Sequence, residues 1–337
     1  MSHRKIDLQL RSNSLLNWFL QPKSICIDGE KQFVKSLISN SISSSYRCID
    51  SNDIETEREV YRIHEIDRSI YDTEYLRPVI KISDLVKKHL SEYIDQFILH
   101  GSLSTFDFIK GWSDFDSIVV IKNKAMCDPS AMMRIRSVFF EIDRIIKKID
   151  THQHHGVHFI TETDLQIYPN LYLPSNLFKD SVSLIKSSEL VINRRDSKKE
   201  EINRFNSIYE TLKGGYSGGM LRHHEYNGEY LMGSFRNYKN AMYQLKYFLS
   251  VVVILPSYFM NILGEYPGKG DSIEKCRAIM KNNGFDIIDK ATQIRSTWTN
   301  YPVLDNIIPD EVMHILDKNY LFDGYNLIKQ MKKYLEI

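Results

Sequence analysis

One stretch, residues 97–121, constrains what this chain can fold into more than any other part of it. It reads FILHGSLSTFDFIKGWSDFDSIVVI. An apolar run ends in His100-Gly101-Ser102, and Asp114-Phe115-Asp116 leads into a second apolar run. Because the side chains of a strand alternate between its two faces, we expect Asp114 and Asp116 to point the same way.

Two carboxylates side by side repel each other unless a positive charge lies between them. Oxygen-rich carboxylate sites suit Mg²⁺. Gly101 lets the backbone approach a ligand closely, and a helix that begins after it would offer free N–H groups to a phosphate. A phosphate cradle and metal-binding carboxylates in one short unit indicate phosphoryl or nucleotidyl transfer.

The same residues resemble the signature of the nucleotidyltransferase superfamily, whose members are DNA polymerase beta-like. That signature is an apolar residue followed by Gly-Ser, a short spacer, and Asp-x-Asp within a strand. The resemblance implies an α+β fold, in which a small mixed-sheet catalytic core is flanked by helices. Residues 268–275 and 288–295 are similar to the C-terminal helical domain of aminoglycoside-type nucleotidyltransferases.

The resemblance also implies an activity and a set of residues. A nucleoside monophosphate would move from a nucleoside triphosphate, ATP among the candidates, to a hydroxyl of a small-molecule acceptor, with release of pyrophosphate. Asp114 and Asp116 would be catalytic and would hold Mg²⁺, as one ion or as two ions about 3.5–4 Å apart. The residues expected to bind the nucleotide are Gly101, Ser102, Ser113 and Lys246, with Trp112 beside them.

The later strand leaves the third acidic ligand and the general base open. The superfamily usually supplies a third carboxylate there, but the central residue of Val157-His158-Phe159 is histidine. Either Glu162 or Asp164 takes the role through a shifted register, or His158 replaces it as ligand or base, or the site has two acidic ligands only. We expect His158 and Glu162 to be catalytic.

A histidine cluster precedes this strand. Imidazole suits zinc, copper and nickel, but the spacing of these histidines matches no standard zinc motif and no cysteine is near. A histidine that contacts nucleotide or acceptor is the second interpretation, and polar loop residues are the third. The cluster consists of His152, His154 and His155, with His158 after them.

Composition bounds the partners and the compartment. The formal net charge of +1 does not show the basic footprint of nucleic-acid binders, so a small-molecule acceptor is expected in preference to a nucleic acid. Nucleotide addition to RNA or protein, or a degenerate nucleotide-binding module, are the alternatives. Four scattered cysteines, no apparent signal peptide and a longest apolar run of only residues 251–255 predict a cytoplasmic protein without a membrane span. Oligomeric state is not indicated.

The chain divides into a predicted extension (1–75), a catalytic domain (76–213) and a C-terminal helical domain (214–337). The extension is either a lid or a packing element, and its serine-rich residues 39–45 are predicted as a loop. Apolar spacing predicts helices over residues 79–93 and from 128 to 146, and strands over 97–99, 118–121, 157–160 and 187–193. Residues 198–212 are predicted as a helix, 214–230 as a loop or hinge, and the chain from 235 onward as helical.

Overall fold

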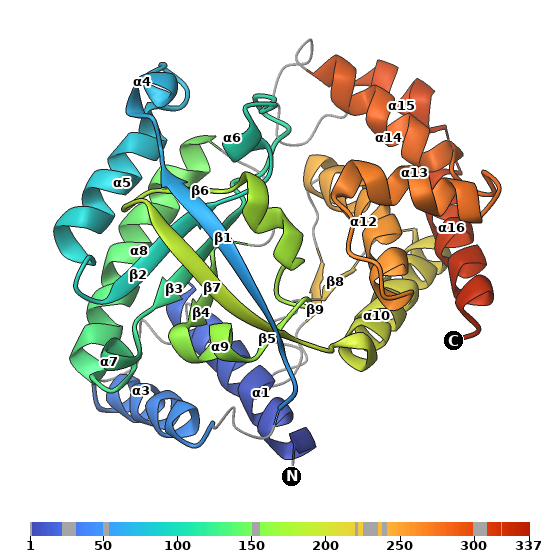
Figure 1. The fold of residues 1–337 in the computed structure, drawn as a ribbon. Coiled ribbons are helices and arrows are strands. Elements are labelled where there is room, and N and C mark those ends of the chain that lie inside the picture. Colours follow the sequence, from blue (N-terminus) through green and yellow to red (C-terminus); the bar gives the residue numbers. More distant parts are fainter. Residues whose placement is uncertain are drawn as a thin grey trace.

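The protein has a mixed α/β fold, seen here in a computed structural model (Figure 1). The structure describes residues 2–21, 32–49, 54–149, 156–219, 222–224, 235–237, 241–298, 309–317 and 319–337. One mixed sheet of seven strands has the order β4-β3-β2-β6-β1-β7-β5. The sheet is larger than the small one expected, because β1, β5, β6 and β7 join it.

The N-terminal and central elements alternate between helices and strands. In order they are α1 (Ser2–Leu20), α3 (Gln32–Arg47), β1 (Glu57–Glu65), α4 (Arg68–Tyr71), α5 (Arg77–His89), β2 (Ile94–Leu99), α6 (Ser102–Thr105), β3 (Ser117–Ile121), α7 (Asn123–Met126), α8 (Pro129–Ile149), β4 (His158–Thr161), α9 (Glu162–Gln166), β5 (Tyr168–Pro169), the 3-10 helix η1 (Ser175–Asp180), β6 (Val182–Ser183) and β7 (Ser188–Arg195). The predicted helix over 128–146 and the four predicted strands are confirmed. The predicted helix over 79–93 is confirmed up to His89, and residues 90–93 are turns instead.

The remaining elements are mostly helical. They are α10 (Lys198–Gly218), β8 (Arg222–His224), β9 (Phe235–Asn237), α12 (Ala241–Ile262), α13 (Lys269–Ile279), α14 (Asp286–Thr297), α15 (Asp310–Leu316) and α16 (Tyr320–Leu335). The strands β8 and β9 pair with each other apart from the large sheet. The prediction of helix from residue 235 onward was therefore wrong at β9.

The two faces of the large sheet differ in what covers them. Val119 and Ile121 of β3 pack into one core with the apolar faces of α5 and α8, and this core also takes in residues of α1 and α3. Ile118 and Val120, on the opposite face, pack into a second, smaller core with residues of β1 and β7. The alternation along β3 thus separates a helix-covered face from a face that is enclosed by the sheet itself.

A third hydrophobic core joins α10, α12 and the helices that follow. Figure 1 shows these helices gathered on the side of the sheet away from α5 and α8. Phe205 and Leu212 of α10 belong to this core. The predicted boundary after residue 213 consequently falls inside α10. Among the described residues, one helical window, Gln244–Ile262, is long and apolar enough to cross a membrane, and 78% of it is buried within the structure.

Two loop predictions were wrong because tertiary packing favours helix. Residues 39–45 lie within α3, where Ile42 and Tyr46 are buried and the hydroxyls of Ser41 and Ser45 donate to carbonyls one turn earlier. Residues 214–218 continue α10, because Tyr216 on its last turns stacks on Tyr325 of α16. Most of the rest of the predicted 214–230 loop lies outside the described residues.

The N-terminal helix covers the edge of the sheet with side-chain amides. Strand β4 pairs with β3 on one side only. On its other side Asn17 accepts a hydrogen bond from Phe159 N at 2.8 Å and donates one to Phe159 O at 2.7 Å, and Gln21 donates to Val157 O at 2.6 Å. Asn13 adds a third donor to this edge. The amides recur every four residues, so α1 satisfies backbone groups that an edge strand would leave open.

We expect Asn17→Ala to lower the free energy of unfolding by about 2–3 kcal/mol, because it leaves the buried N–H of Phe159 without its acceptor. Asn203→Ala is the matched control, since Asn203 lies exposed on α10 and should change stability by no more than about 0.5 kcal/mol. Chemical denaturation of both variants measures the difference. Equal losses would show that the amide contacts do not stabilise the edge.

Glu201, at the start of α10, gives stability a pH dependence. Its side chain is fully buried beside Ser197, and burial raises its pKa to about 7. The stabilising protonated form is fully present below the unfolded pKa near 4.5 and is lost as pH rises through about 7.

Glu201→Gln should therefore match the wild type at pH 4.5 and exceed its free energy of unfolding at pH 8, by on the order of 3 kcal/mol. Urea unfolding at several pH values measures this gap. The control is Glu210→Gln, an exposed glutamate on the same helix, which should show no such trend. A gap that does not widen with pH would contradict the prediction.

Candidate functional site

Gly101 has a backbone conformation that other residues rarely adopt. It follows β2 and caps the single-turn helix α6 with φ 66° and ψ −149°. Its carbonyl accepts hydrogen bonds from the backbone N–H groups of Ser104 and Thr105. The predicted helix start after Gly101 is therefore present, but four residues give only a small helix dipole.

Asp114 and Asp116 lie immediately before β3. The N–H of His100 donates to Asp116 O at 3.2 Å, which ties this segment to the end of β2. Phe115 between the two acids is fully buried in the core under the helices, whereas both acids are only partly buried. By the alternation of the strand, Asp116 shares the face of Ile118 and Val120.

The glycine and the acid pair meet in space. A Cβ placed on Gly101 would lie only 2.7 Å from Oδ2 of Asp116. The backbone at Gly101 therefore packs directly against the Asp116 carboxylate, and a side chain would fill the room between them. Ser102 follows as the first residue of α6.

Lys246 reaches the other carboxylate from the C-terminal helices. It is the one charged residue of α12, and its Nζ lies 2.7 Å from Oδ1 of Asp114. The side chains of Lys246 and Asp114 keep 7% and 19% of their surfaces exposed. A charge in so apolar a helix is costly unless it is paired, so the position of Lys246 is explained by Asp114.

Lys269 was missed as a site residue in the sequence. It begins α13 after the cap Gly268, and the residue as a whole is exposed although its ammonium group is partly desolvated. Burial lowers the pKa of Lys269, while the charges of Asp116 and Asp114 act to raise it. The sequence signal was a lysine between glycines at a helix start, but nothing in the pattern indicated its proximity to the acids.

The spacer between Ser102 and Asp114 contacts the C-terminal helices. Arg295 of α14 pairs with Asp107 at 2.5 Å, and the rings of Trp112 and Trp298 are 4.9 Å apart. Burial acts to raise the pKa of Asp107, but hydrogen bonds from Thr105 and Arg295 outweigh it and lower that pKa. These contacts fix the spacer against α14, which in turn packs against α12, the helix that carries Lys246.

Ser113 has a structural contact that the sequence did not predict. Its hydroxyl accepts a hydrogen bond from Ile109 N at 2.9 Å, and the residue is buried. The hydroxyl thus closes the turn that precedes Asp114.

His158 lies on the strand next to the acids and on their face. It pairs in parallel register with Ile118, two residues beyond Asp116, and its ring is 5.3 Å from that of Tyr172. Paired residues of parallel strands point to the same side, so His158 occupies the level at which the resemblance implies a third acid.

Glu162 and Asp164 do not join the acid pair, because the chain turns into α9 after Thr161 instead of extending β4. By the pairing of β4 with β3, Glu162 lies level with Lys122, six residues beyond Asp116 and hence roughly 20 Å away along the strand. Its carboxylate accepts from Asn123 N at 2.7 Å. The expectation that Glu162 is catalytic is therefore corrected by its position.

Asp164 is fully buried in a hydrogen-bond network that includes Gln9, Tyr46 and Tyr172. Burial raises the pKa of Asp164, and its contacts are those of a structural carboxylate. Through Tyr172, whose ring contacts His158, this network supports one side of the site.

The carboxylates of Asp114 and Asp116 fit a Mg²⁺ ion that is also coordinated by a phosphate chain. Mg²⁺ is commonly bound by one or two carboxylates together with substrate phosphates. Asp114 and Asp116 supply two carboxylates, and the close approach of Gly101 leaves a side-chain-free space beside Asp116. Among the described residues, no three His, Cys, Asp or Glu side chains gather as a metal site, and the cluster of His152, His154 and His155 lies outside them.

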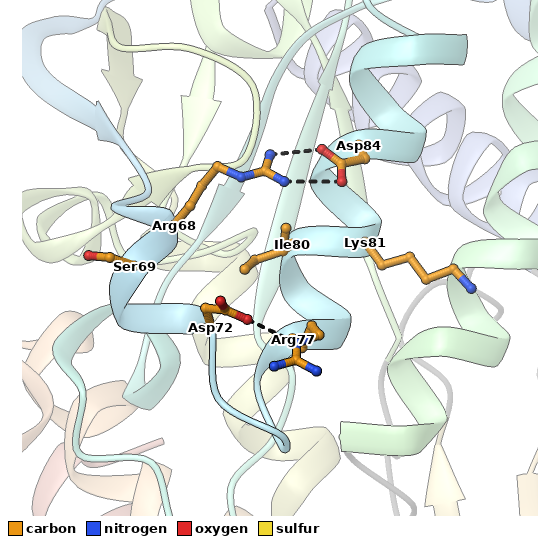
Figure 2. A pocket seen from close by; sticks show the side chains of 7 residues that line it. All are labelled: Arg68, Ser69, Asp72, Arg77, Ile80, Lys81 and Asp84. Carbon is orange, nitrogen blue, oxygen red and sulfur yellow. Dashed lines mark hydrogen bonds and ion pairs between the residues drawn. The ribbon is translucent and has the colours of Figure 1, made fainter.

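A separate surface hollow of about 520 Å³ lies at α4 and the start of α5 (Figure 2). Figure 2 shows Arg68 paired with Asp84 and Arg77 paired with Asp72 along its wall. None of its lining residues belongs to the site around Asp114 and Asp116, and we assign it no part in the reaction.

Comparison with known proteins adds no relative: no protein-family model and no curated protein matches this chain.

Proposed function

We propose that this protein is a Mg²⁺-dependent nucleotidyltransferase that moves a nucleoside monophosphate from a nucleoside triphosphate to a hydroxyl of a small-molecule acceptor. The observation that carries the proposal is the packing of Gly101 against the Asp116 carboxylate. A side-chain-free backbone beside a metal-binding acid is the arrangement that a metal-bound triphosphate requires. The order β2, α6, β3, α8, β4 supports the nucleotidyltransferase core that the sequence resembles.

The chain's own residues would divide the work between carboxylates and cations. Asp114 and Asp116 would hold Mg²⁺, which when bound supplies positive charge to the triphosphate and lowers the pKa of the acceptor hydroxyl. Gly101 and Ser102 would bind phosphate oxygens through the backbone N–H and the hydroxyl. Lys246 would contact the phosphate chain from the side of α12.

Lys269 would contact the phosphate chain as well, at the leaving pyrophosphate. It extends from the N-terminal end of α13, where backbone N–H groups also favour negative charge. A lysine ammonium held near two carboxylates has room to turn to a phosphate that binds between them. Loss of pyrophosphate would then be assisted by Lys269 and Lys246 together.

His158 is the residue best placed to accept the acceptor's proton. It faces the same side as Asp116, on the adjacent strand. A general base must lie within hydrogen-bond reach of the proton that it removes. Because Glu162 and Asp164 are excluded by their positions, His158 alone remains of the three candidates.

The decisive experiment incubates the full-length protein with Mg²⁺, each α-labelled nucleoside triphosphate in turn, and separate pools of small molecules and RNA. We expect label to enter a small molecule and pyrophosphate to be released. Label in RNA or in the protein itself would keep the reaction but change the acceptor. If the chain binds triphosphate without any transfer, it is a degenerate nucleotide-binding module and the proposal fails.

A further inference from the structure

The contact between Lys246 and Asp114 means that the lysine ammonium group and a divalent ion would compete for the same carboxylate. Nζ of Lys246 is 2.7 Å from Oδ1 of Asp114, and both side chains are largely buried. A divalent ion bound at Asp114 would require the same carboxylate. Like charges that are only a few ångströms apart repel strongly in a partly buried site, so the ammonium group and the ion exclude each other there.

The lysine is anchored, but its ammonium group is able to move. Its neighbours in sequence, Leu245 and Tyr247, are buried in the core of the C-terminal helices, which fixes the backbone of α12. The flexible four-carbon stem of lysine still allows its ammonium group to turn toward another anion. An incoming triphosphate would offer such an anion beside Asp114.

A second lysine, Lys269, is also influenced by the acid pair. The charges of Asp116 and Asp114 both act on the ammonium group of Lys269, and Arg295 and Asp107 are the other charged groups that act on it. The positive charges of Lys246 and Lys269 therefore both act on the acid pair, and Lys246 is in direct contact with Asp114. The pair of acids attracts a divalent ion less strongly than two bare carboxylates would.

We propose that Lys246 is a displaceable counter-ion of Asp114, which makes binding of a divalent ion at the acid pair depend on a bound phosphate chain. The ammonium group leaves Asp114 for a phosphate oxygen as the ion takes the carboxylate. This role rests on the proposed function and deepens it, because it sets the order in which metal and triphosphate bind. Without a phosphate chain the Asp114 carboxylate stays paired with Lys246.

The test measures Mn²⁺ binding directly, by the loss of the free-ion signal in electron paramagnetic resonance, without any turnover. For the nucleotide-free protein we expect Lys246→Met to bind Mn²⁺ at least about tenfold more tightly than the wild type, because a competing positive charge is removed. The double variant Lys246→Met with Asp114→Asn should lose this gain. Lys275→Met is the matched control, since it removes an exposed lysine that pairs with Glu265, and it should bind like the wild type.

A second arm adds inorganic tripolyphosphate, which needs no choice of base. Because tripolyphosphate itself chelates Mn²⁺, this arm measures protein-bound Mn²⁺ by equilibrium dialysis against the same mixture. Tripolyphosphate should tighten Mn²⁺ binding to the wild type by about tenfold or more, and to Lys246→Met by much less. Equal Mn²⁺ affinities of the wild type and Lys246→Met without phosphate would overturn the proposal. Circular dichroism checks folding, and Lys246→Gln replaces the methionine variant under the same criteria if that variant does not fold.

The two proposals fail in different ways. If tripolyphosphate and every nucleoside triphosphate fail to bind the wild type with metal present, the nucleotidyltransferase assignment is wrong. If triphosphate binds and label is transferred, but Lys246→Met does not alter Mn²⁺ affinity, only the counter-ion role is wrong. The pair of Lys246 and Asp114 is then a permanent structural contact.

Discussion

Asp116→Asn should lower the rate of nucleotidyl transfer by on the order of 10³-fold, the scale on which enzymes lose rate when a group that stabilises transition-state charge is removed. Asparagine keeps the shape of the side chain but removes the negative charge that Mg²⁺ needs. Single-turnover transfer of label from the preferred triphosphate measures the effect.

The control for this variant is Asp84→Asn. Asp84 is an exposed acid on α5 that pairs with Arg68 in the surface hollow of Figure 2. Its replacement should leave the transfer rate unchanged, because surface ion pairs contribute little and the hollow is separate from the site. A similar rate loss in both variants, or an Asp116→Asn variant as active as the wild type, would show that Asp116 does not hold the metal.

Short-range patterns in the sequence predicted the strands and helices around the acid pair well. The alternation at Asp114-Phe115-Asp116 predicts that the two acids point the same way, and the structure buries Phe115 between them in the helix-covered core. The apolar spacing of α5 and α8 likewise depends on local geometry, which a periodic pattern carries directly. These helices are stabilised by apolar faces, and the spacing of the apolar residues that form them can be recognised in the sequence.

The residues on either side of Glu162 carry a local signal for the start of a helix. Thr161 and Asp164 form a capping box, in which each side chain bonds the other's backbone N–H. The spacing of a threonine and an acid three residues later indicates a helix start. Read in this way, the sequence ends β4 at Thr161 and removes Glu162 from the site.

Other features could not be predicted from local pattern. The amides of α1 recur every four residues, but their partner strand lies more than a hundred residues away in sequence. The electrostatic influence of Asp116 on Lys269 likewise depends on how α13 packs against α12. Such contacts are set by tertiary packing, which overrides local propensity and leaves no periodic trace.

Gly101→Ala should lower both stability and the rate of transfer, because the alanine would meet backbone strain and a clash with the Asp116 carboxylate. The φ of 66° with ψ of −149° lies in a region that is essentially limited to glycine, so alanine costs about 1–3 kcal/mol in backbone strain. Its Cβ would also lie 2.7 Å from Oδ2 of Asp116, which forces the carboxylate or the backbone to move. A shift of that kind at a catalytic group lowers rates by about 10²-fold.

Gly264→Ala separates the two costs. Gly264 also has a positive φ, 85°, but a Cβ there would meet no atom of the described residues within 4 Å. We expect Gly264→Ala to reduce the free energy of unfolding through backbone strain while transfer stays at the wild-type rate. Gly101→Ala should lose both stability and transfer. If Gly101→Ala is destabilised but still transfers nucleotide at the wild-type rate, the contact between Gly101 and Asp116 is structural, and the observation that carries the proposed function no longer supports it.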